Sequence, residues 1–200
     1  NLLETPDGGQ VLFKGQDITD KKLNISKYRQ SIGMVFQHFN VFPNLTVLEN
    51  VELPLLYAGV SLKERRERAA EALKAVGLEE RMEFFPNQLS GGQCQRLVIA
   101  RALLRSDSAV YIFDEAASNI DVESEELIMN VIHELAKTKT VLLISHRLAN
   151  VVQSDQIYFL KNGTICERGT HAELMEQNGA YRHLYDSQMV LENYGKQGNA

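Results

Sequence analysis

Short apolar runs alternate along this chain with longer segments in which apolar residues recur every three or four positions. The runs at 109–113 (AVYIF) and 140–144 (TVLLI) have the length of strands, and 31–37 (SIGMVFQ) is a further strand candidate. Between the first two, one face of a predicted helix carries Leu127, Ile128, Val131 and Leu135. Strand, helix, strand without polar alternation predicts a βαβ unit in a parallel sheet that is covered on both faces.

Capping residues and glycines predict the other elements. Thr46 with Glu49 forms the pattern of a capping box before a helix, and Ser61 with Glu64 repeats it before a helix that ends at Gly77. The pair Asn162-Gly163 between two apolar segments is typical of a type I′ hairpin turn. Further helices are expected over 93–105 and from 172 and 181, and further strands at 11–13, 157–160 and 164–167.

Composition narrows the class of protein. The 200 residues are 44% hydrophobic and 24% charged, which suits one good-sized globular core. A net charge of −5 argues against a dedicated nucleic-acid binder, which needs a basic face. We find no apolar run of the roughly 20 residues that span a bilayer and no export signal at the start. Cys94 and Cys166, far apart in sequence, are expected to be reduced thiols.

Polar residues follow two of the predicted strands directly. Asp114-Glu115 comes after AVYIF, and Ser145-His146 comes after TVLLI. Parallel strands end at the same edge of a sheet, where ligands bind. A carboxylate at that position suits Mg²⁺ during phosphoryl transfer, and the next one, Glu115, can polarise an attacking water. Taken alone, the pair fits an ordinary polar strand end equally well.

A glycine step precedes the helix expected from 93. In Ser90-Gly91-Gly92 the glycines allow backbone amides to approach an anion, and the helix N-terminus adds partial positive charge. A lone SGG is more often only a turn. Here it lies within 89–96 (LSGGQCQR), followed by 99–103 (IARAL) and the acidic strand.

With these motifs in this order, the sequence resembles the ATP-binding subunits of ABC transporters over essentially its whole length. The matching positions are Gln37 (Q-loop), 89–93 (signature LSGGQ), 111–114 (end of Walker B), Glu115 (catalytic glutamate), Ser118 to Asp121 (D-loop, including Asn119) and His146 (switch histidine). The resemblance implies an α/β fold: a P-loop NTPase (RecA-like) core with a parallel sheet, here lacking its first strands, plus an inserted α-helical subdomain. It divides the chain into core at 1–43, helical subdomain at 44–104, core again at 105–193, and a tail at 194–200.

The resemblance also implies a function, which is coupling of ATP hydrolysis to transport in a head-to-tail dimer that encloses ATP and Mg²⁺. The implied ATP contacts are Gln37, Ser90, Gly91, Gly92, Gln93 and Asp121; the metal is assigned to Gln37 and Asp114, and catalysis to Glu115 and His146. The implied partners are a second, identical or different, ATP-binding subunit and transmembrane permease subunits, with no nucleic acid. The implied location is cytoplasmic, peripheral on the inner face of the cell membrane.

The sequence departs from the family at its beginning. No G-x-x-x-x-G-K-[ST] occurs, and 1–4 (NLLE) reads like the inside of a helix. We therefore expect a chain that begins inside the P-loop helix, and that alone binds ATP poorly with weak or no hydrolysis. Residues 37–105 resemble ATPases of amino-acid importers or of lipoprotein-release and macrolide-efflux systems, whereas the part from Asp114 resembles fused exporters. Amino acids are thus one candidate cargo, and the direction of transport stays open.

Two other functions remain as alternatives. A degenerate, non-catalytic ABC module would supply only its signature loop to an intact partner, although the retained Glu115 and His146 argue against decay of the catalytic edge. A soluble ABC ATPase acting on DNA or the ribosome would carry coiled-coil insertions or a more basic surface, and this chain has neither.

Overall fold

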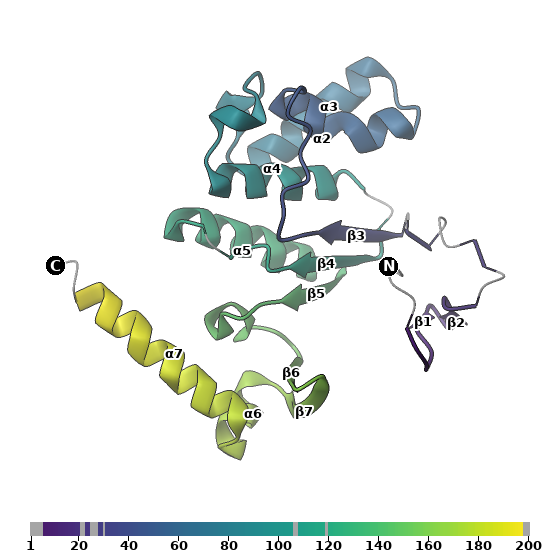
Figure 1. Cartoon of the computed structure of the whole chain (residues 1–200). Coiled ribbons are helices and arrows are strands. Elements are labelled where there is room, and N and C mark those ends of the chain that lie inside the picture. The colour runs from purple at the N-terminus through teal and green to yellow at the C-terminus, as the bar shows by residue number, and fades with distance from the viewer. Residues whose placement is uncertain are drawn as a thin grey trace. The chain divides into compact units, whose positions relative to one another are not determined.

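A computed structural model describes residues 6–20, 23–24, 28–29, 31–105, 108–118 and 120–197 (Figure 1). The expected helical start at 1–4 and Asn119 of the predicted D-loop lie outside these residues. The chain forms two compact units, Asn1–Ile144 and Ser145–Ala200. Of the described helices, none combines the length and the apolar character that crossing a membrane requires.

A three-stranded parallel sheet forms the centre of the first unit. Its strands are β3 (Ile32–Val35), β4 (Val110–Asp114) and β5 (Thr140–Ile144), in the order β3-β4-β5. This confirms the predicted βαβ unit, with α5 (Val122–Ala136) as the connecting helix. Gly33 lies opposite Tyr111 in the register, and a Cβ there would come within 2.5 Å of the tyrosine ring. Glycine at 33 therefore makes room for a buried aromatic residue.

The prediction that both faces of the sheet are covered is wrong for β5. Val141 and Leu143 pack against the core, but Leu142 and Ile144 remain 49% and 44% exposed. Because successive side chains of a strand point to opposite faces, an apolar run is buried throughout only where elements cover both faces. In the described residues α5 covers one face of β5, and its other face is largely open.

Three helices form a layer on the sheet, α2 (Val47–Tyr57), α3 (Leu62–Ala75) and α4 (Gly91–Leu103), with short 3₁₀ turns η1 (Glu79–Arg81) and η2 (Pro86–Gln88) between the last two. Helix α4 contacts α2, α3, α5 and β3, and so lies between the other two helices of the layer and the sheet (Figure 1). It starts at Gly91, earlier than expected, because Ser90 caps it.

The helix-start predictions are confirmed for α2 and only half correct for α3. Thr46 and Glu49 form the complete capping box. At α3 the Ser61 hydroxyl accepts a hydrogen bond from the Glu64 backbone at 3.4 Å, but the Glu64 carboxylate pairs with Arg68 instead of returning to the cap. Gly77, with φ +66°, follows the end of α3 as predicted.

Two antiparallel hairpins complete the described strands. In the first unit β1 (Leu12–Phe13) pairs with β2 (Gln16–Asp17), a strand that the apolar pattern did not predict. In the second unit β6 (Ile157–Lys161) pairs with β7 (Thr164–Gly169), and positive φ angles at Asn162 and Gly163 confirm the predicted turn.

The second unit also holds η3 (Leu148–Val151), α6 (His171–Gln177) and α7 (Ala180–Gln197). Tyr181 is fully buried there and meets Phe159 of β6 edge-on. Cys94, in the first unit, and Cys166 are both free thiols, as expected.

Candidate functional site

The acidic pair lies where β4 ends. Asp114 is the last residue of the strand, opposite Ile144 of β5, and the Glu115 backbone N–H donates to the Ile144 carbonyl at 3.0 Å. Glu115 adopts φ +49°, a left-handed conformation that costs a residue with a side chain about 1–2 kcal/mol. Ser118 stabilises it, because its backbone N–H and its hydroxyl both donate to the Glu115 carbonyl, at 3.0 and 2.8 Å. The surrounding bonds thus hold the Glu115 backbone in a strained position.

Gln37 reaches the same edge from β3. It follows the strand by two residues, and its Nε2 donates to Glu115 Oε2 at 3.0 Å. The two residues are 78 positions apart, and they meet because neighbouring parallel strands end at one edge of the sheet. The structure therefore brings together Gln37 and Glu115.

The donors at this edge fit a magnesium ion that is shared with a phosphate ligand. In the described part of the chain, no group of three or more His, Cys, Asp or Glu residues could form an all-protein metal site. Mg²⁺ usually keeps several waters and takes one or two protein oxygens together with substrate phosphates. Asp114 supplies a carboxylate for such a site. Gln37 uses its amide nitrogen on Glu115, so its amide oxygen is the atom available to a cation.

The signature residues form the start of α4. Ser90 is the N-cap: its hydroxyl accepts from the Gln93 backbone at 3.2 Å, and Gln93 Oε1 accepts from the Ser90 backbone at 3.0 Å. Gly91 and Gly92 occupy the first two helical positions, whose N–H groups have no acceptor within the helix. This is an anion-binding arrangement, in which N–H donors and the helix dipole point to the same place.

Asp121 caps α5 beside that turn. Its Oδ1 accepts from the Ser124 backbone at 2.8 Å, and hydrogen bonds from Ser124 lower the pKa of Asp121. A Cβ on Gly92 would meet Ser124 Oγ at 2.4 Å and Asp121 Oδ2 at 2.8 Å. The structure thus places Gly92 and Asp121 together, with Ser124 between them. Sequence reasoning missed Ser124, because its contact with Gly92 depends on how α5 packs against α4.

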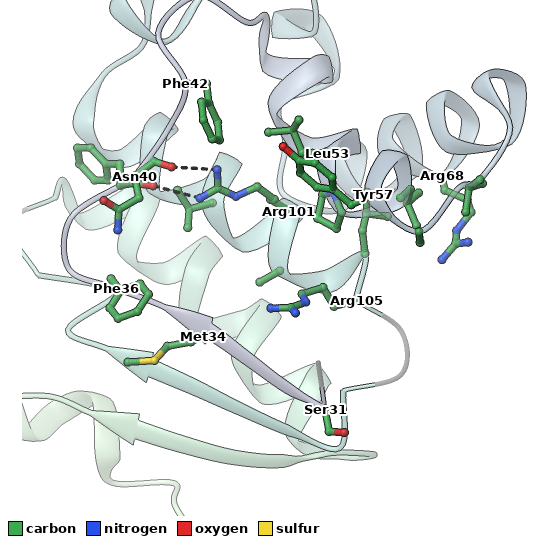
Figure 2. Close-up of a pocket in the computed structure, with 18 of the residues that line it drawn as sticks. Ser31, Met34, Phe36, Asn40, Phe42, Leu53, Tyr57, Arg68, Arg101 and Arg105 are labelled. Atoms are coloured by element: carbon green, nitrogen blue, oxygen red, sulfur yellow. Dashed lines mark hydrogen bonds between the residues drawn. The ribbon is translucent and has the colours of Figure 1, made fainter. Parts of the chain in front are cut away.

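Sequence reasoning also missed Arg101. From α4 its Nη1 donates to the carbonyl of Asn40 at 3.0 Å and its Nη2 to that of Phe39 at 3.4 Å (Figure 2). Asn40 has φ +46°, and burial lowers the pKa of Arg101. Arg101 thus ties the segment that follows Gln37 to the signature helix. No local pattern could have shown this, because the contact spans 61 residues.

A groove of about 1010 Å³ adjoins Arg101. Figure 2 shows aromatic and aliphatic side chains from the segment after β3 and from α2 around it, together with three arginines. The cations are Arg68, Arg101 and Arg105, and no described carboxylate lines the groove. A chain with a net charge of −5 therefore carries a locally basic, apolar groove.

His146 belongs to the second unit, and its side chain is exposed. Gln188 of α7 fixes the backbone there: its Nε2 donates to the His146 carbonyl at 2.7 Å, and its Oε1 accepts from the Leu148 backbone at 2.9 Å. Gln188 was not among the predicted residues, since its role depends on folding of the second unit.

Comparison with known proteins identifies the family. The sequence model of the family described as ABC transporter matches residues 1–118. The chain belongs to the ABC transporter ATP-binding family. The predicted α/β, P-loop NTPase class is confirmed as well, since its structural neighbours are ABC ATPase cassettes.

Several named members of this ABC family are similar to the chain. The arginine transport ATP-binding protein ArtM of Bacillus subtilis (strain 168) is 41% identical over 180 residues, which are 86% of this chain and 73% of ArtM. The methionine import ATP-binding protein MetN of Streptomyces griseus is 43% identical over 191 residues, which are 90% of this chain and 53% of MetN. The chain thus spans about half the length of this methionine relative.

Two solved ABC structures share the fold. The dimeric cassette MJ0796, in a post-hydrolysis state bound to ADP and Pi, aligns with a TM-score of 0.77 and 37% identity over 84% of this chain and 76% of that one. A bacterial Atm1-family ABC exporter with ATP bound aligns with a TM-score of 0.79 and 28% identity over 92% of this chain and 32% of that one.

Proposed function

We propose that the chain supplies the catalytic edge and the signature turn of an ATP-hydrolysing subunit of an ABC transporter, paired with a second ATP-binding subunit and driving a permease at the inner face of the cell membrane. Because no G-x-x-x-x-G-K-[ST] occurs in the sequence, we expect this chain alone to bind ATP poorly and to hydrolyse it weakly or not at all. The observation that carries this proposal is the bond between Gln37 and Glu115 at the carboxyl edge of the sheet. The relatives named for arginine transport and methionine import favour amino acids as the cargo.

Each proposed site residue around the carboxyl edge of the sheet has its own role. Glu115 orients a water and accepts its proton, while the Gln37 amide holds the Glu115 carboxylate in place through the 3.0 Å bond. Asp114 and the Gln37 amide oxygen would hold Mg²⁺, which when bound would neutralise charge on the phosphate oxygens. His146 donates a hydrogen bond to a phosphate oxygen.

The signature turn acts on ATP held by the second subunit. Ser90, Gly91 and Gly92 present a hydroxyl and backbone N–H groups at the start of α4, and Gln93 fixes the turn through the capping box. The charge that develops on phosphate during transfer meets donors that are already oriented, so little reorganisation is needed at the moment of reaction. Asp121 lies beside this turn and, in this proposal, contributes to the same face.

The groove at Arg101 is the proposed docking site of the permease. Its aromatic lining suits the apolar face of a helix, and its three arginines suit a carboxylate on that helix. Because Arg101 bonds to the carbonyls of Phe39 and Asn40, an occupant of the groove would act on the segment that carries Gln37.

The test is ATP hydrolysis by the transporter complex purified from membranes through a tag on this subunit. Glu115→Gln should lower kcat by about 10²–10⁴ while ATP still binds, because it removes the general base. Glu126→Gln, an exposed carboxylate on α5, is the matched control. The permease should co-purify, and Arg68→Glu in the groove should reduce its recovery, whereas Arg66→Glu, exposed on the same helix, should not.

Wild-type kcat in the Glu115→Gln complex would contradict the proposed reaction. If the signature turn nevertheless proved essential to that complex, the chain would act as a non-catalytic module toward an intact partner.

A further inference from the structure

The first turns of α4 and α5 pack against each other without space for a side chain. A Cβ on Gly92 would lie 2.4 Å from Ser124 Oγ and 2.7 Å from Ser124 Cβ, distances that real Cβ atoms do not show. Ser124 is only 3% exposed, so it has little room to move aside. By contrast, a Cβ on the neighbouring Gly91 would meet Phe39 Cζ at 3.7 Å, an ordinary contact. The two glycines of the signature turn are therefore under different constraints.

Electrostatics reinforce the same contact. The Asp121 carboxylate caps α5 and lies near Gly92, so one negative charge is close to the N-termini of two helices. The backbone and side-chain hydrogen bonds of Ser124 lower the pKa of Asp121, and the positive charge of Arg96 on α4 contributes. Arg96 in turn donates to the carbonyls of Val76 and Gly77 after α3. Ser124 thus belongs to a continuous set of contacts from α3 through α4 to α5.

We propose that Ser124 is a positioning residue: packed against Gly92, it fixes the signature turn of α4 to the Asp121 end of α5, so that the two segments of one chain facing nucleotide move together. The expected effect on ATP hydrolysis rests on the proposed function, whereas the packing itself rests on the geometry at Gly92. Position 92 therefore requires glycine because of Ser124 in the same chain, in addition to any ligand.

The first test is independent of activity and measures hydrogen exchange of backbone amides in the purified full chain. Gly92→Ala should accelerate exchange over residues 120–125 at least about fivefold, the low end of what overpacking costs. Gly92→Ala combined with Ser124→Gly should return exchange toward wild type, and combined with Ser124→Ala should do so less, because Cβ remains. Gly91→Ala is the matched control and should leave exchange over 120–125 unchanged.

Ser124→Gly alone tests the contact without added atoms, in case Gly92→Ala does not fold. It should accelerate exchange over 91–94 on the other helix. Glu123→Gly, which places a glycine at the adjacent exposed position of α5, should not. Equal effects of these two glycines on residues 91–94 would overturn the inference.

The second test is ATP hydrolysis by the transporter complex. Gly92→Ala should lower kcat at least about tenfold, because a displaced signature turn misplaces its donors. Adding Ser124→Gly should restore kcat to within about threefold of Ser124→Gly alone. If glycine is required only because nucleotide approaches it, the second substitution will not rescue, and the inference fails. A wild-type complex that hydrolyses no ATP would contradict the proposed function instead, and the exchange data would then decide this inference alone.

Discussion

At the residue scale, Asp121, which lies beside the signature turn, makes the stability of the fold depend on pH. Hydrogen bonds from Ser124 lower the pKa of its carboxyl below the ordinary value of 3.8, so the folded state favours the charged form. The stability gained from this difference is fully present above pH 3.8 and is lost as pH falls through the lowered pKa of the folded state.

Asp121→Asn should therefore weaken the loss of stability in acid. Asn is as good an N-cap as Asp, so the free energy of unfolding at neutral pH should stay close to that of wild type. Below pH 3.8 the variant should lose less stability than wild type does. Urea unfolding followed by far-UV circular dichroism measures both, since the chain has no Trp. Glu126→Gln is the control. If Asp121→Asn lost as much stability in acid as wild type does, the role given to Asp121 would be wrong.

At the element scale, one ion pair joins α2 to α3 inside the helical layer. Arg65 Nε lies 3.3 Å from Glu52 Oε2, and the two side chains are 18% and 7% exposed. Neither of these two atoms makes a well-oriented hydrogen bond, so the attraction is mainly between charges. Burying the two charges between the helices costs desolvation free energy, which their mutual attraction offsets. If one partner is removed, the other charge stays buried without a partner.

Glu52→Gln should accordingly destabilise the fold by about 3 kcal/mol, whereas Glu52→Gln with Arg65→Met should recover most of that loss. The matched control is Glu64→Gln in the exposed pair with Arg68, which should cost under about 0.5 kcal/mol. Urea unfolding gives each value. A double variant as unstable as Glu52→Gln would show that the pair itself, and not the unpaired charge, determines stability.

Local signals in the sequence predicted many of the helices and strands. Thr46 with Glu49, Ser90, and Asn162-Gly163 act within a few residues, so their patterns fix local structure. The direction of parallel strands places Gln37 and Glu115 at one edge of the sheet, but the hydrogen bond between them was not predicted. Arg101 and Ser124 contact segments far away in sequence. Leu142 is exposed because its face of β5 is largely open. Such facts depend on tertiary packing, which a single sequence pattern does not encode.

At the scale of the whole molecule, the second unit has its own stabilising contacts. Glu167 of β7 accepts from the backbone N–H of Ala180 at 2.5 Å and of Tyr181 at 3.1 Å, so it caps α7 from outside the helix. A Cβ on Gly179 would come within 2.5 Å of a Glu167 carboxylate oxygen, so a side chain at 179 would displace this cap. Tyr181 is buried, and its hydroxyl bonds to His171 Nδ1 of α6 at 2.8 Å.

Glu167→Ala should destabilise this unit by about 1–2 kcal/mol, because two N–H groups at the start of α7 lose their acceptor. Since the chain forms two compact units, the acceleration of amide exchange should be confined to residues 145–197. Glu176→Ala, an exposed glutamate on α6, provides the comparison. Exchange that rises equally over 31–105 would mean that the units unfold as one cooperative body.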